Sequence, residues 1–243
     1  MKVLFLLFLF SSLNLTAVNY QERFLQANEY YKEGKVEEAF NLYNSIPKKS
    51  GIINYNLGNC AYKQKKYGLA LAYWKKAEKH WGIWNKSDLR HNISTVEQKV
   101  LPRSYTDRLT TFLAKFKNEV FSYLISVPLS VLQILFLALW LFLFVYLKFL
   151  YRNKHKILII LLFLLIAIFG TLLAIRYSLE FRRYGVVVKP QAQLLSGPDN
   201  RFSVLGELPE VLEVVISKEL NGYYKIKFDG GIGWISKVEV EEI

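Results

Sequence analysis

Two uninterrupted apolar stretches dominate the chain: VPLSVLQILFLALWLFLFVYL at residues 127–147 and ILIILLFLLIAIFGTLLAI at residues 157–175. Neither contains a charged residue, and each is close to the ~20 residues that an α-helix needs to cross the hydrocarbon core of a bilayer. Pro128 falls in the first turn of the first helix, where its missing N–H costs no hydrogen bond. The sequence therefore predicts two transmembrane helices.

The connection between these stretches, residues 148–156, is rich in basic residues and contains no acidic one. So short a link predicts a helical hairpin, and its positive charge favours a tip in the cytoplasm. The composition agrees with two membrane helices. A chain with 52% hydrophobic residues and a formal charge of +12 is expected to concentrate its apolar residues in runs. The charged residues flank those runs, so membrane topology explains the positive charge better than nucleic-acid binding does.

The N-terminus contains a third, shorter apolar segment. Within residues 1–17, the basic residue Lys2 lies close to the N-terminus, and the segment finishes with Leu15-Thr16-Ala17. This pattern predicts a secretory signal peptide, and an uncleaved anchor is the alternative. Export of the N-terminal region followed by two crossings returns the C-terminal region to the same side. We therefore expect both soluble regions outside the cytoplasm.

Residues that usually carry chemistry are scarce. The single cysteine, Cys60, excludes an intramolecular disulfide, and three histidines cannot build the usual Cys/His zinc spacings. Cys60 is either a redox sensor or a small buried thiol, and the lack of a resolving cysteine favours the second reading. Neither apolar stretch holds an ionisable residue, which disfavours transport. We therefore expect no enzymatic activity, no cofactor and no metal.

Residues 20–100 have a helical pattern with internal repetition. Three residues recur 31 positions later: Ala27, Ala39 and Tyr43 as Gly58, Ala70 and Trp74. This spacing resembles the tetratricopeptide repeat, in which small residues let the two helices of a pair pack closely. The segment at residues 91–94 repeats Asn56-Leu57-Gly58 after 36 residues, which predicts a third repeat helix or a capping helix.

The tetratricopeptide resemblance implies a concave groove that binds an extended protein segment. On that register the groove residues are Asn28, Tyr31, Lys32, Tyr55, Asn59, Tyr62 and Lys63. Asparagine amides hold a peptide backbone and tyrosines supply apolar area, although the same residues also fit ordinary half-exposed helix positions. Ala70 and Trp74 are expected on the opposite, packing side. The carboxylate clamp of some co-chaperones is broken, because Phe24, Asp88 and Asn92 occupy its basic positions.

Between the repeats and the first span, apolar residues again follow helical spacing. They are Leu109, Phe112, Leu113, Phe116 and Val120, with basic residues elsewhere around the helix. The pattern predicts an amphipathic juxtamembrane segment over residues 102–126. It either lies on the bilayer surface or extends the first transmembrane helix.

From Tyr184 onward the apolar period changes to two. Short strands are expected at Val186–Val188, Leu194–Leu195, Val211–Ile216, Tyr223–Phe228 and Gly233–Ile235. The order of turn and strand motifs resembles a bacterial SH3-like domain, a small β-barrel, with its signature at Gly197, Pro198, Gly230, Gly233 and Trp234. Trp234 either closes the barrel or stacks on a ligand. Val211 stands where that family usually has glycine.

The order of the segments is more specific than any one motif. It reads: signal peptide 1–17, tetratricopeptide-repeat domain 18–101, juxtamembrane segment 102–126, transmembrane helices 127–147 and 157–175 around a cytoplasmic loop 148–156, and SH3-like domain 184–243. This order resembles the BatE-type aerotolerance proteins. The resemblance implies a bacterial inner-membrane protein with two periplasmic domains, acting beside MoxR-type ATPases and von Willebrand factor A proteins in envelope or oxidative stress.

Two hypotheses follow from this organisation. The first is a non-enzymatic scaffold whose repeats and SH3-like domain hold partner proteins in the periplasm. The second is a membrane anchor that binds peptidoglycan or senses the cell wall through the SH3-like domain. An enzyme is the least favoured reading, because the only cysteine lies inside a repeat helix.

Overall fold

The computed structural model describes residues 20–80, 87–102, 127–150 and 156–243. The expected signal peptide at 1–17, nearly all of the juxtamembrane segment at 102–126 and the centre of the loop at 148–156 lie outside these residues. The chain divides into two compact units. One unit combines Met1–Arg108 with Arg183–Ile243, and the other is Leu109–Arg182.

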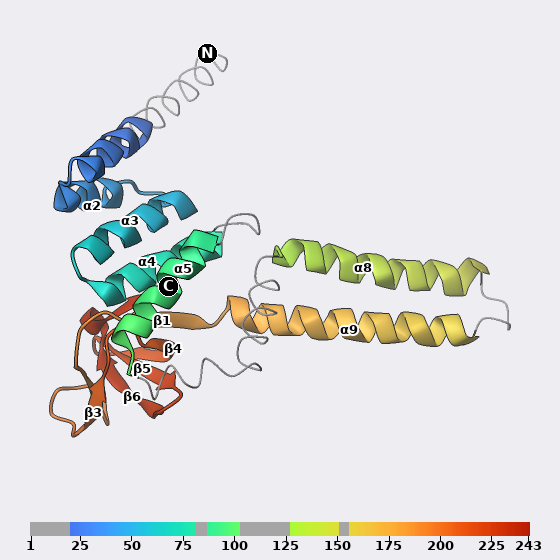
Figure 1. The fold of residues 1–243 in the computed structure, drawn as a ribbon. Coiled ribbons are helices and arrows are strands. Elements are labelled where there is room, and N and C mark those ends of the chain that lie inside the picture. Colours follow the sequence, from blue (N-terminus) through green and yellow to red (C-terminus); the bar gives the residue numbers. More distant parts are fainter. Residues whose placement is uncertain (1–19, 81–86, 103–126, 151–155) are drawn as a thin grey trace, which may run out of the picture. The chain divides into compact units, whose positions relative to one another are not determined.

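The first unit begins with a series of antiparallel helices (Figure 1). They are a helix at residues 20–32, α2 at Val36–Asn44, α3 at Gly51–Lys63, α4 at Tyr67–His80 and α5 at Ser87–Val100. Ser50 caps α3 by accepting a hydrogen bond from the Ile53 N–H, as serine commonly does at a helix N-terminus. The helical expectation for residues 20–100 is therefore confirmed over the described residues.

The turns between paired helices repeat with the period seen in the sequence. Gly34 and Lys65, which are 31 residues apart, both have a left-handed backbone with φ of 79° and 62°. In the first turn the Lys35 N–H donates to the Tyr30 carbonyl, and the equivalent bond in the second turn starts from Lys66. The 31-residue repetition is thus a repetition of backbone geometry as well as of residue type.

Small residues allow the helices to approach closely. A Cβ added at Gly58 of α3 would overlap the ring of Trp74 on α4, so only glycine fits there. The repeated alanines Ala27, Ala39 and Ala70 are fully buried between helices. α5 packs against α4 through Leu89, Ile93 and Val96, as expected for a third repeat helix or a cap.

The second part of this unit is a seven-stranded antiparallel sheet in the order β3-β2-β6-β5-β4-β1-β7. Its strands are β1 Arg183–Val187, β2 Ala192–Leu195, β3 Val204–Leu208, β4 Glu213–Leu220, β5 Tyr223–Phe228, β6 Gly231–Ser236 and β7 Val240–Glu242, with a 3-10 turn at Lys237–Glu239. The expectation of only five strands was wrong. β3 and β7 were missed because they are edge strands, which pair on one side only and carry little burial pattern.

Helices and sheet share one hydrophobic cluster, in which Ala70 and Leu71 of α4 pack with Val186 and Val211 of the sheet region. The buried Glu210 carboxylate accepts a 2.7 Å hydrogen bond from the Gly68 N–H in the first turn of α4. We call this contact between α4 and the sheet the joint. Its existence means that the two soluble regions of the sequence fold against each other.

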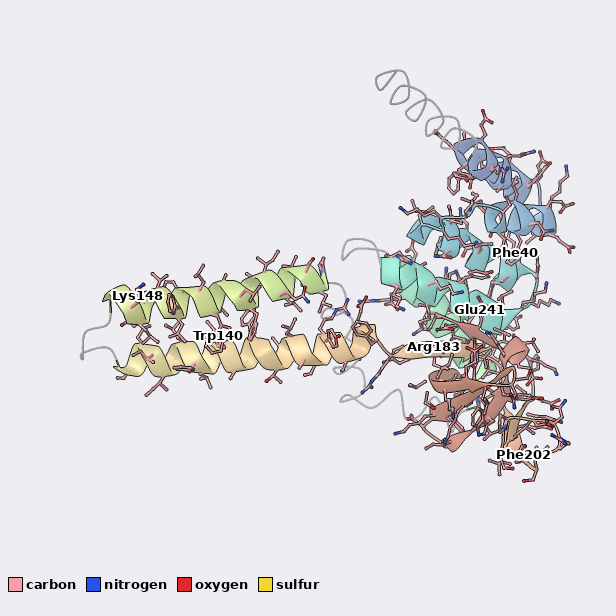
Figure 2. The ribbon with its side chains drawn as sticks, turned by 180° about the vertical axis from the view of Figure 1, so that it is seen from behind. Phe40, Trp140, Lys148, Arg183, Phe202 and Glu241 are labelled. Carbon is pink, nitrogen blue, oxygen red and sulfur yellow. The ribbon has the colours of Figure 1, made fainter. Side chains whose placement is uncertain are left out.

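Ion pairs reinforce the joint. Lys75 of α4 lies 2.6 Å from Glu213 and 4.0 Å from Glu97, and so connects α4, β4 and α5. Burial lowers the pKa of Lys75, but the carboxylates of Glu213, Glu97 and Glu78 together raise it by more. The net shift is upward, so the side chain stays charged. Lys76 pairs with Glu241, which Figure 2 shows beside the helices.

The second unit contains two apolar helices side by side (Figure 1). α8, Leu129–Val145, continues as a π-helical turn at Tyr146–Leu150, and α9 spans Lys156–Glu180. They pack through a cluster that includes Leu143 and Ile166, and Trp140 lies edge-on to Phe163 with 6.5 Å between ring centroids (Figure 2). The hairpin pairing expected for these stretches is confirmed.

Both helices are long and apolar enough to cross a membrane, over Leu129–Lys148 and Ile157–Glu180. Most of their large apolar side chains are exposed, with Ile157 reaching 75% and Leu137 65%. A core helix of a water-soluble protein would bury such side chains, so the exposure favours contact with lipid.

Candidate protein-binding groove

A groove of about 330 Å³ opens on the face of the helical array. Its lining comes from four helices: Tyr31 of the first, Asn59, Tyr62 and Lys63 of α3, Trp74 of α4, and His91, Asn92 and Thr95 of α5. The volume lies at the lower end of the range for ligand sites. The groove is open to solvent, as a site for part of a longer chain must be.

Aromatic rings form the floor of the groove. The Tyr62 ring centroid lies 5.7 Å from that of Trp74. It also lies 5.6 Å from the centroid of Tyr67, a residue outside the lining. Only 2% of the Trp74 surface is exposed, whereas Tyr31 and Tyr62 remain partly accessible. Rings held in this way offer rigid apolar area at little cost in side-chain entropy.

Two asparagines present opposite hydrogen-bonding groups. The Trp74 indole N–H donates to Asn59 Oδ1 at 3.1 Å, which leaves the Asn59 amide hydrogens as donors. Asn92 Nδ2 donates to the Tyr55 hydroxyl at 3.3 Å, which leaves Asn92 Oδ1 as an acceptor. The groove therefore contains one amide that can donate and one that can accept.

Two lysines lie over the aromatic rings. Lys63 Nζ is 4.1 Å from the centroid of the Tyr31 ring. Lys99 Nζ is 4.6 Å from the Tyr67 centroid and 5.6 Å from that of Tyr62, and it donates a 2.9 Å hydrogen bond to the Tyr67 hydroxyl. Burial raises the pKa of Tyr31, so its phenol is uncharged.

The structure brings four of the seven sequence-predicted groove residues together: Tyr31, Asn59, Tyr62 and Lys63. The remaining three have other contacts. Asn28 accepts a 2.6 Å hydrogen bond from Tyr43, Lys32 pairs with Glu29 in solvent, and Tyr55 binds Asn92 from outside the lining.

Four lining residues were missed. Trp74 was expected on the packing side, yet it both packs against Gly58 and lines the groove. His91, Asn92 and Thr95 come from α5. Asn92 and Thr95 follow Asn59 and Tyr62 after 33 residues. A repeat offset of 33, rather than 36, would therefore have predicted Asn92 and Thr95 as lining residues.

The SH3-like signature residues serve packing in the sheet. Gly197 lies against the Phe202 ring, Gly230 against Phe228 and Gly233 against Leu194. Trp234 is half-buried in β6, opposite Leu195 of β2 and Lys225 of β5. Pro198 is half-buried after Gly197.

Cys60 lies on α3 but does not line the groove. Its side chain is fully buried, and burial raises its pKa to about 11. A protonated, inaccessible thiol is a poor nucleophile and a poor redox sensor. The reading of Cys60 as a small buried residue is therefore confirmed.

No protein-family model matches the chain, and no curated protein sequence matches it significantly. The geometry of the groove therefore carries the functional proposal.

Proposed function

We propose that the chain is a non-enzymatic, membrane-anchored scaffold of the BatE type that holds a segment of a partner protein in its groove. The helical array is a tetratricopeptide-repeat domain and the sheet is an SH3-like domain, both in the bacterial periplasm. The hairpin anchors them in the inner membrane. The partners are MoxR-associated von Willebrand factor A membrane proteins or their complex, in envelope or oxidative stress tolerance.

The observation that carries this proposal is the composition of the groove. An aromatic floor, one amide that can donate, one that can accept and the Lys63 ammonium group fit recognition of a polypeptide segment. The repetition of the Gly34 and Lys65 turns supports the tetratricopeptide assignment, because it gives successive helix pairs the same geometry.

The joint supports the proposed topology. Glu210 and Val211 of the C-terminal region pack on α4 of the N-terminal region, which supports placing both regions on one side of the membrane. Two crossings between them give that arrangement. The basic residues Lys148 and Lys156 at the ends of the link favour a cytoplasmic tip.

A bulky substitution at Thr95 tests the proposal, because it fills the groove without removing a contact between groove residues. Thr95 is exposed, and its hydroxyl bonds only to the His91 carbonyl of its own helix. In crosslinking of native membranes followed by mass spectrometry, Thr95→Trp should reduce partner recovery about tenfold or more, which corresponds to ~1.4 kcal/mol of binding free energy. Gln98→Trp is the matched control, because Gln98 is exposed on the same helix outside the lining.

Protection of Cys60 from alkylation verifies that both variants are folded. The proposal fails if Thr95→Trp retains its crosslinks, or if Gln98→Trp loses them equally. Sedimentation of the full-length protein with peptidoglycan sacculi addresses the wall-binding alternative. Strong sedimentation with unchanged crosslinks in Thr95→Trp would favour the anchor over the scaffold.

A further inference from the structure

We infer that the groove selects an acidic extended segment, whose carboxylates pair with Lys63 and Lys99. This inference rests on the proposed function, since it names the chemistry of the segment that the scaffold binds. It concerns cations at positions other than those of the broken carboxylate clamp, which hold Phe24, Asp88 and Asn92.

Lys63 and Lys99 differ from other lysines of the same compact unit in the contacts that their ammonium groups make. Several lysines have carboxylate partners within 4 Å: Lys32, Lys35, Lys75, Lys76, Lys189 and Lys237. Within the described residues, Lys63 and Lys99 instead contact aromatic rings and a tyrosine hydroxyl. A cation–π contact holds an ammonium group in place but leaves its charge uncompensated.

The surroundings favour an anionic ligand. The lining residues include no aspartate or glutamate, whereas Lys63 contributes a positive charge. Aromatic rings on the floor exclude water from one side of a bound segment, which strengthens a carboxylate–ammonium pair relative to one in open solvent. A cationic segment would meet the Lys63 charge in the lining and the Lys99 charge beside the Tyr62 ring, and it is therefore disfavoured.

The remaining groove groups fit an extended conformation. The Asn59 amide hydrogens and Asn92 Oδ1 pair with backbone carbonyl and N–H groups. Apolar or aromatic side chains that alternate with acidic ones would reach the partly accessible Tyr62 ring, which the nearly buried Trp74 supports from below. The preferred segment therefore alternates carboxylate and aromatic side chains.

The probe is a fluorescein-labelled peptide of alternating glutamate and tyrosine, roughly ten residues long, compared with its glutamine–tyrosine analogue. Binding is measured by fluorescence polarisation with the full-length protein in detergent micelles. The glutamate peptide should bind about tenfold more tightly than the glutamine peptide, and its affinity should fall as salt is raised.

Variants assign the effect to the two lysines. Lys63→Gln with Lys99→Gln should remove the preference, and Lys63→Arg with Lys99→Arg should retain most of it. The matched control is Lys48→Gln with Lys218→Gln, which removes the same charge from exposed positions outside the groove. Cys60 protection reports that each variant is folded.

Equal binding of both peptides, binding of neither, or an unchanged preference in the Lys63/Lys99 glutamine variant overturns the inference. The groove's role in partner capture is decided separately by the Thr95→Trp crosslinks. If those crosslinks are lost while the peptides are not distinguished, the acidic preference fails and the scaffold function stands. If the peptides are distinguished but the crosslinks persist, the scaffold function fails.

Discussion

Val211 combines a strained backbone with a buried side chain. Its φ of 76° lies in the left-handed region, which β-branched residues rarely adopt and which costs about 1–3 kcal/mol. Its side chain is 1% exposed in the joint, and its N–H donates to the Val187 carbonyl at 2.9 Å. The SH3-like resemblance places glycine here, so this chain accepts strain and gains an apolar contact with α4.

This balance predicts an unusual order of stabilities. Val211→Ala keeps the strain and loses two methyl groups, about 1.6 kcal/mol of apolar burial. Val211→Gly loses one carbon more but relieves the strain, so it should be as stable as Val211→Ala or more so, with both below the natural chain. The measurement is the denaturant dependence of Cys60 alkylation in full-length protein in micelles, since Cys60 is the only thiol. A glycine variant clearly less stable than the alanine variant would show that the left-handed backbone costs little here.

At the scale of elements, α4 is organised by residues distant in the chain. Its first turn donates the Gly68 N–H to Glu210, a residue 142 positions away. Such a cap satisfies an N–H that the helix itself leaves unpaired, and its negative charge suits the helix N-terminus. Burial nevertheless raises the pKa of Glu210, and the backbone hydrogen bonds from Gly68 and Tyr67 only partly offset this shift.

Removal of this cap should weaken both the helix and the joint. Glu210→Ala should lower the free energy of unfolding by about 1–2 kcal/mol at neutral pH, as measured by Cys60 alkylation. Glu210→Gln, which keeps an acceptor oxygen, should lose less. If Glu210→Ala matches the natural chain, the hydrogen bond contributes nothing to the joint.

The raised pKa sets the sign of the pH dependence. Because the folded state holds the Glu210 proton more tightly than the unfolded state, the natural chain should gain stability relative to Glu210→Gln as pH falls from neutral to about 4. Other carboxylates are present in both proteins and cancel in the difference. A change of opposite sign would mean that the folded state favours the ionised carboxylate.

At the scale of the whole molecule, one compact unit is built from chain segments on either side of the apolar hairpin. Lys79 near the end of α4 donates to the carbonyl of Ile243, the last residue. α4 and the C-terminal strands thus depend on each other, although the hairpin separates them in sequence. Synthesis of the C-terminal region is therefore required before the face of α4 that forms the joint can be covered.

This arrangement predicts the result of topology mapping. Alkaline phosphatase fused after Val100 or after Ile243 should be active, whereas a fusion at Asn153 should be inactive, because the proposed topology puts both soluble regions outside the cytoplasm and the hairpin tip within it. Opposite activities at Val100 and Ile243 would contradict the joint. Activity at Asn153 alone would invert the orientation while leaving the joint intact.

Local patterns made much of the architecture predictable. The two apolar stretches predict the hairpin, because uncharged runs near 20 residues long suit membrane-spanning helices and the link between these two is short. The 31-residue period determines the paired helices, and Asn221-Gly222 correctly marks the turn between β4 and β5, where both residues have positive φ. Each of these signals acts over a few residues or repeats at a fixed interval.

The joint and half of the groove were decided only by tertiary structure. Glu210, Val211 and Lys75 act through partners far away in the chain, and such contacts leave no periodic signature in the sequence. Trp74 fills the space at Gly58 and still reaches the groove, because one large ring spans two faces of its helix. The sequence pattern thus determined the helices and five of the seven strands, whereas packing between distant segments decided the two edge strands and which side chains meet.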